Sequence, residues 1–87
     1  MGQFVYVYVL RSLRDTNLYV GFTTDLRQRV EAHNGGRVDS TRTRTPFELI
    51  YYEACRSRQD ATRREKYLKS AWGKRFLKNR PSSYLTG

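Results

Sequence analysis

One run of residues near the start of the chain is apolar on both of its faces. Residues 4–10 read FVYVYVL, so that valines fill one face of an extended chain while aromatic side chains and a leucine fill the other. In a strand, neighbouring side chains point to opposite sides of the sheet. A strand with two apolar faces needs cover on both sides, and we therefore expect it at the centre of a sheet.

The remaining pattern predicts a small α/β domain of the α+β type, with a mainly antiparallel three-stranded sheet flanked by helices. Turn residues at 14–17 separate the first strand from a second β-rich run and indicate an antiparallel hairpin. Helical spacing begins after capping residues and stops at glycines. The expected order is β-β-α-β-α-α, with strands at residues 3–11, 18–22 and 47–54 and helices at 26–34, 61–72 and 74–80.

The boundaries of these elements depend on a few side chains. We expect residues 23–25 to cap the first helix, because Thr and Asp accept hydrogen bonds from the free N–H groups of a first turn. Ser57 or Asp60 is expected to do the same for the second helix. One face of the third strand is expected to hold Phe47, Leu49 and Tyr51.

The chain is short and basic. Its 87 residues suffice for one core, so we expect a single domain over residues 1–87. Lysine and arginine number 17 against 8 acidic residues, and the net charge of +9 predicts attraction to a polyanion. Nucleic acid is the expected partner, although a ribosome or an acidic lipid surface would attract such a chain as well.

Cysteine content and hydropathy predict the compartment. Cys55 is the one cysteine and has no partner for an internal disulfide, and its place at the end of a strand predicts a buried, reduced thiol. No apolar run approaches the ~20 residues of a membrane span, and the N-terminus has no basic leader. We expect a cytoplasmic protein without a membrane partner.

Two of the predicted helices carry polar side chains within their apolar faces. Steps of three and four residues place Arg29 and His33 on one face of the first helix with Leu26 and Val30. Burying an unpaired carboxylate costs several kcal/mol, so Glu65 on the second helix needs a cation, an arginine or solvent. The stripe that contains it consists of Ala61, Glu65, Leu68 and Trp72.

These side chains allow a structural and a catalytic interpretation. In the first, Arg29 pairs with Glu65 inside the protein, and His33, Tyr8 and Tyr19 are core residues. In the second, they form a set suited to phosphodiester hydrolysis. A carboxylate holds a hard divalent ion on a phosphate oxygen, an arginine offsets charge in the transition state, and a phenol or imidazole takes a proton from water.

Four segments of the chain form a recognisable pattern: YVYVLRS, NLYVGFTTDLRQRVEAHN, FELIYYEA and TRREKYLKSAW. The combination of YVG with Thr23, Arg29 and the pair His33-Asn34 seldom recurs by chance. In these segments the chain resembles the GIY-YIG nuclease family over nearly its whole length, and in particular the short, free-standing bacterial members.

This resemblance implies a role for each motif residue. Tyr8 and Tyr19 match the two motif tyrosines, of which one serves as the base, and the sequence does not choose between them. Arg29 matches the arginine that faces the phosphate, and His33 matches the position that assists proton transfer. Glu65 matches the carboxylate that holds the metal, one Mg²⁺ or Mn²⁺ ion.

Other positions match the family less closely. Gly21 closes the second motif, where a side chain would crowd the site or the turn. Asn79 corresponds, on weaker grounds, to a late asparagine that helps in some members. The first motif has Tyr6 in place of its glycine, and the second has Val20 in place of isoleucine. The first motif is therefore relaxed.

The sequence thus predicts a metal-dependent endonuclease that reads nucleic-acid structure more than sequence, with DNA favoured over RNA and DNA repair as the role the family suggests. Two alternatives remain open: a nucleic-acid-binding module with little or no cleavage, and a structural protein with an Arg29–Glu65 ion pair. Oligomeric state stays undetermined. The cations suited to phosphate contacts are Arg37, Arg42, Arg44, Arg63, Arg64, Lys66 and Lys69.

Overall fold

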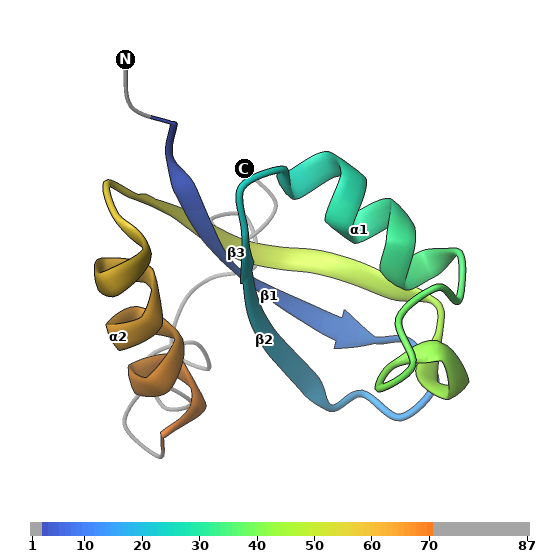
Figure 1. Cartoon of the computed structure of the whole chain (residues 1–87). Coiled ribbons are helices and arrows are strands. Elements are labelled where there is room, and N and C mark those ends of the chain that lie inside the picture. Colours follow the sequence, from blue (N-terminus) through green and yellow to red (C-terminus); the bar gives the residue numbers. More distant parts are fainter. Residues whose placement is uncertain (1–2, 71–87) are drawn as a thin grey trace.

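The computed structural model describes residues 3–70, which form one antiparallel three-stranded sheet and two α-helices. The elements in chain order are β1 (Val5–Ser12), β2 (Leu18–Thr23), α1 (Leu26–Asn34), the 3-10 turn η1 (Arg42–Arg44), β3 (Phe47–Cys55) and α2 (Arg58–Lys69). The strands lie in the order β2-β1-β3, so the strand with two apolar faces is central, as predicted. The two helices lie on opposite sides of the sheet (Figure 1).

Capping residues set where both helices begin. α1 has the predicted bounds, and the Asp25 side chain accepts a hydrogen bond from the Gln28 backbone N–H at 3.1 Å. α2 begins three residues before the predicted Ala61, because Ser57 caps it and accepts from the Asp60 N–H at 3.1 Å. It ends at Lys69, short of the predicted residue 72; the helix predicted at 74–80 lies outside the described residues.

A bulge in β3 changes which side chains share a face. The register between β1 and β3 shifts once, so that Leu49 and Tyr51 face successive residues of β1 and Ile50 is the extra residue between them. Leu49 packs with Phe47 on the α1 side, whereas Tyr51 packs on the α2 side. The prediction that Phe47, Leu49 and Tyr51 share a face is therefore wrong for Tyr51, since the extra residue reverses the alternation.

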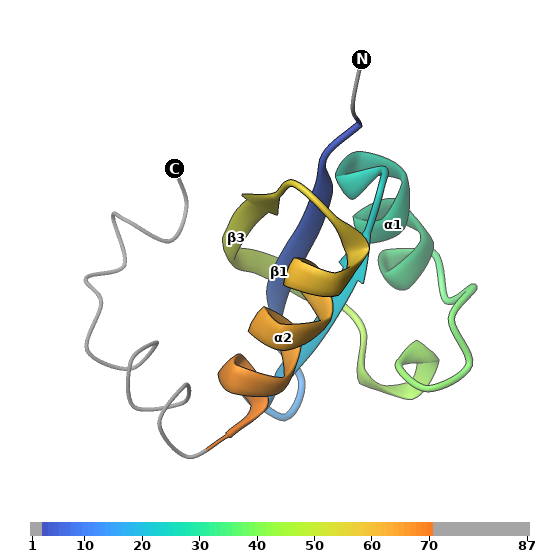
Figure 2. The same cartoon turned by 60° about the vertical axis from the view of Figure 1, so that its left-hand side comes forward.

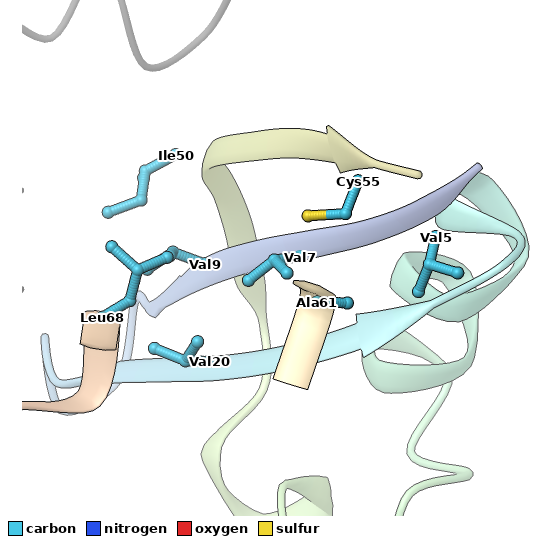
Figure 3. Close-up of a cluster of buried hydrophobic side chains, with 8 residues drawn as sticks. All are labelled: Val5, Val7, Val9, Val20, Ile50, Cys55, Ala61 and Leu68. Atoms are coloured by element: carbon cyan, nitrogen blue, oxygen red, sulfur yellow. The ribbon is translucent and has the colours of Figure 1, made fainter. Parts of the chain in front are cut away.

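Small aliphatic side chains fill the space between the sheet and α2 (Figure 3). Ala61 and Leu68 are fully buried and lie against the valines of β1. Cys55 is buried at the end of β3, as predicted. Apolar burial of this kind stabilises by about 25 cal/mol per Å². The whole cluster consists of Val5, Val7, Val9, Val20, Ile50, Cys55, Ala61 and Leu68.

The α1 side of the sheet has a smaller apolar cluster of buried Tyr8, Leu10 and Phe47. Leu26 and Val30 of α1 pack against it and are half-buried, which confirms the apolar face predicted for that helix. Neither helix within residues 3–70 has the length and apolarity needed to cross a bilayer. The polar side chain of His33 packs against Phe47 of this cluster, with ring centroids 6.0 Å apart, and the candidate site lies there.

Candidate active site

The hairpin of β1 and β2 brings the motif tyrosines together at a glycine. Tyr8 faces Gly21 across the two strands, and Tyr19 comes two residues earlier on β2. A β-carbon at Gly21 would lie 2.7 Å from the Tyr8 hydroxyl oxygen and 3.2 Å from the Tyr19 ring. Gly21 therefore lets the Tyr8 side chain lie across β2, where any other residue would displace it.

A buried hydrogen-bond chain starts from the Tyr8 hydroxyl. This oxygen lies 2.9 Å from Nε2 of His33, and Nδ1 of His33 lies 2.8 Å from Oγ1 of Thr41. His33 and Thr41 are fully buried, and Tyr8 is 1% exposed. The His33 ring also packs against Tyr19, with ring centroids 4.9 Å apart. Since buried polar groups need partners, these contacts explain how an imidazole is tolerated on the inner face of α1.

α1 is attached firmly to the start of β3. The Asn34 side chain accepts from the Phe47 backbone N–H at 2.7 Å and donates to the Phe47 carbonyl at 3.1 Å. This pairing resembles one step of a strand ladder and fixes the end of the helix that carries His33. The sequence marked Asn34 as part of a motif, and the structure adds this physical role.

Charge and burial keep the tyrosine–histidine pair neutral. Burial raises the pKa of Tyr8 above its ordinary value, while the nearby Arg29 guanidinium partly opposes the rise. Burial, with a further effect of Arg29, lowers the pKa of His33 to about 4. At neutral pH Tyr8 thus holds its proton and His33 has a free lone pair. Arg29 acts on both groups, as its position one turn before His33 requires.

Glu65 reaches the same neighbourhood from the other side of the sheet. Its negative charge contributes to the raised pKa of Tyr8. Its carboxylate pairs with Nζ of Lys69 at 3.3 Å, and its side chain is 20% exposed. No ion pair joins Glu65 to Arg29 among the described residues, so the predicted alternative of an internal Arg29–Glu65 pair is wrong. Glu65 is left with a solvent-facing, exchangeable cation.

The donor set fits one hydrated divalent ion. Residues 3–70 contain no cluster of three or more His, Cys, Asp or Glu side chains that would form a cage of protein ligands. Mg²⁺ seldom requires such a cage, because it keeps several waters and is held by one or two carboxylates with substrate phosphate oxygens. Glu65, partly exposed and close to Tyr8, satisfies this description.

Of the seven cations predicted to contact phosphate, two have their guanidinium groups engaged within the protein. Arg44 pairs with Asp15 at 2.7 Å and lies over the Phe47 ring, and Arg64 forms two hydrogen bonds with Glu53 at 2.6 and 3.1 Å. Lys69 pairs with Glu65, as described above. The exposed cations that remain are Arg37, Arg42, Arg63 and Lys66.

The fold and the cluster around Tyr8 define a small α+β domain of the nuclease class. Residues 4–79 match the GIY-YIG catalytic domain, and the chain belongs to this family of nucleases. It resembles UPF0213 proteins in particular. One from Haloquadratum walsbyi is 41% identical over 71 residues, covering 80% of this chain and 79% of that protein. One from Clostridium perfringens is 42% identical over 65 residues, covering 74% and 69%.

A solved structure supports the same assignment. The solution NMR structure of a UPF0213 protein from Bacillus halodurans is 36% identical in sequence and has a TM-score of 0.52. The match covers 85% of this chain and 81% of that one. Family and fold therefore agree with the order of strands and helices described above.

Proposed function

We propose that this protein is an endonuclease that depends on a divalent ion and hydrolyses phosphodiester bonds, with DNA as its substrate. One observation carries the proposal: groups from three elements, Tyr8 of β1, Arg29 and His33 of α1, and Glu65 of α2, act on one another around a single phenol in a domain of a nuclease family. Each has a chemistry that phosphodiester hydrolysis needs. GIY-YIG nucleases in general use divalent ions.

Tyr8 is the group that removes a proton from the attacking water in this proposal. Its hydroxyl contacts His33 at 2.9 Å, so as its oxygen takes a proton from water its own proton passes to Nε2 of His33. The phenol is regenerated, and the charge moves to the imidazole. Tyr19, whose ring packs on His33, holds that ring in place. The proposal therefore assigns the role of base to Tyr8, where the sequence leaves the choice between the two tyrosines open.

Arg29 and Glu65 act on the phosphate. The guanidinium lies close enough to Tyr8 to oppose the rise in its pKa, and from there it would offset the negative charge that grows on the phosphate oxygens. Glu65 would hold the divalent ion, which when bound withdraws charge from a phosphate oxygen. Loss of the Lys69 contact with the carboxylate would cost little, because the Lys69 side chain is 56% exposed and exposed ion pairs contribute little to stability.

The relaxed first motif is compatible with this chemistry. Tyr6, which occupies the place of the family glycine, packs edge-on against Tyr52 of β3 with ring centroids 6.3 Å apart. It makes no ring contact with Tyr19 or His33 among the described residues. The replacement therefore leaves the Tyr8–His33 pair unobstructed, which favours an active nuclease over a scaffold that only binds nucleic acid.

Structure-directed recognition is part of the proposal. The exposed cations Arg37, Arg42, Arg63 and Lys66 are suited to phosphate contacts, which position a nucleic acid without reading its sequence. Single strands, flaps and branches are the substrates to compare with duplex DNA.

A cleavage panel with a matched pair of variants tests the proposal. Labelled single-stranded, duplex, flap and branched DNA and an RNA are incubated with Mg²⁺, Mn²⁺ or EDTA. Wild type and Glu31→Gln, which alters an exposed carboxylate on α1, are expected to give product only with metal. Glu65→Gln is expected to bind but not to cleave. Equal cleavage by Glu65→Gln, or cleavage in EDTA, would refute the metal-dependent mechanism.

A further inference from the structure

Thr41 is a buried residue in the middle of an exposed, polar loop. The loop between α1 and β3 lies beneath the C-terminal end of α1 (Figure 2). Ser40 and Arg42 are exposed, yet the Thr41 side chain is fully buried. The sequence shows only a polar segment suited to phosphate contacts. A threonine turned inward between two exposed residues instead has a specific partner, and that partner is His33.

The protons of this buried cluster can be assigned by counting acceptors. A neutral imidazole has one N–H donor and one acceptor nitrogen, and His33 lies between two hydroxyl groups, those of Tyr8 and Thr41. Arg29 is only a donor, so the one acceptor within hydrogen-bond range of the Tyr8 proton among the described residues is Nε2 of His33. Thr41 has a second acceptor, the carbonyl of Val38 at 3.4 Å.

Only one arrangement gives every buried proton an acceptor. Thr41 donates to the Val38 carbonyl, Nδ1–H of His33 donates to Oγ1 of Thr41, and the Tyr8 hydroxyl donates to Nε2. The reverse arrangement would leave the Tyr8 proton buried and unpaired, which costs more than a weak Thr41–Val38 bond returns. Which of the two ring nitrogens carries the hydrogen is thus decided by the hydrogen bond that the other nitrogen makes.

We infer that Thr41 is a positioning residue that holds His33 in the Nδ1–H tautomer, with Nε2 free to accept the proton of Tyr8. The inference rests on the function proposed above for its catalytic consequence, though the tautomer itself does not. When the Tyr8 proton reaches Nε2, the imidazole becomes charged, and its Nδ1–H already donates to Thr41. No side chain has to turn during the transfer.

The chain offers a direct spectroscopic test, because His33 is its single histidine. In ¹⁵N-labelled protein at pH 7, a long-range ¹H–¹⁵N spectrum is expected to show a protonated Nδ1 and an unprotonated Nε2. Thr41→Val removes the acceptor with little change of shape and is expected to shift the ring toward the Nε2–H form. Thr41→Ser keeps the hydroxyl and is expected to retain the wild-type pattern. Thr43→Val, an exposed position in the same loop, is the matched control.

Cleavage rates provide the second measurement. Thr41→Val is expected to lower kcat about 10- to 100-fold, by analogy with the loss of a hydrogen-bond partner that orients a metal-ligating histidine. Thr41→Ser is expected to restore most of the rate, and Thr43→Val to match wild type. A rescue by serine separates loss of the hydroxyl from a general disturbance of the loop, and the same spectra report whether each variant is folded.

The outcomes keep the two proposals apart. An Nε2–H tautomer in wild type, or an unchanged spectrum in folded Thr41→Val, overturns the inference whether or not the protein cleaves nucleic acid. The expected spectra combined with no cleavage by wild type would refute the nuclease proposal and leave the tautomer assignment standing. The expected spectra with a wild-type kcat in Thr41→Val would remove Thr41 from the mechanism and so overturn its positioning role.

Discussion

The two faces of the sheet are built from alternate residues of the same strand, yet they differ in kind. The face toward α2 is packed with valines, Leu68 and other small apolar side chains. The face toward α1 carries the three buried polar side chains of the described region, Ser12, His33 and Thr41. Burial of polar groups stabilises a fold less than burial of aliphatic ones. The α2 side therefore provides stability, and the α1 side holds groups placed for chemistry.

Removing one hydroxyl oxygen from the polar face should have the largest expected effect, and that effect is on the rate of cleavage. Tyr8→Phe keeps the ring and deletes the hydroxyl that contacts His33. We expect cleavage to fall about 1000-fold, while the free energy of unfolding changes by about 1 kcal/mol. Single-turnover cleavage and urea unfolding measure the two quantities. Tyr67→Phe, on the exposed side of α2, is the control. A greater loss in Tyr19→Phe than in Tyr8→Phe would reverse the roles assigned to the two tyrosines.

Removing bulk from the aliphatic face should act on stability. Leu68→Ala opens a cavity beneath a fully buried side chain, and we expect the free energy of unfolding to fall by about 3 to 4 kcal/mol. Lys66→Ala, exposed on the same helix, should change it by about 0.5 kcal/mol or less. Urea unfolding of both variants measures these two changes in the free energy of unfolding. If Leu68→Ala lowers the free energy of unfolding by no more than Tyr8→Phe does, the α2 side of the sheet does not provide more stability than the α1 side.

The polar face should also make stability depend on pH. The pKa of His33 is lowered from 6.5 to about 4 in the folded protein, so between these values the unfolded chain binds a proton that the folded one does not. Stability should therefore fall as the pH drops from 6.5 to 4, by up to about 3 kcal/mol. His33→Gln lacks this titration and should show a shallower decline in urea unfolding between pH 7 and pH 4.5. Parallel curves for the two proteins would mean that His33 is not held neutral.

The smallest expected effect is on DNA binding, where an exposed arginine beside the polar face should contribute more than one that is paired within the protein. Arg42 is exposed, whereas Arg44 pairs with Asp15. In EDTA, Arg42→Ala should weaken DNA binding by about 1 kcal/mol and reduce the slope of log affinity against log salt by about 1. Arg44→Ala should leave that slope unchanged. If both variants alter the slope equally, the Arg44–Asp15 pair opens when nucleic acid binds.

Sequence periodicity predicted much of this arrangement because its signals are local. The two apolar faces of residues 4–10 predicted a central strand, and the bounds of α1 followed from Asp25 and the glycines after Asn34. The start of α2 was predicted less well, since both Ser57 and Asp60 are competent caps and only the fold selects one. The bulge at Ile50 could not be predicted from the sequence, because both neighbours of that residue are apolar and the pattern does not show which of them is the extra residue.

The sequence by itself determined which residue types share a face. Arg29 and His33 are one helical turn apart, and Tyr8 alternates with valines, so their orientation follows from the periods of helix and strand. Only the tertiary structure decided which atoms meet. His33 contacts Tyr8 and Thr41 at 25 and 8 residues' separation, and Arg44 rather than Arg42 finds an acidic partner 29 residues away. Hydrogen bonds depend on tenths of an ångström, and packing between distant segments sets those distances.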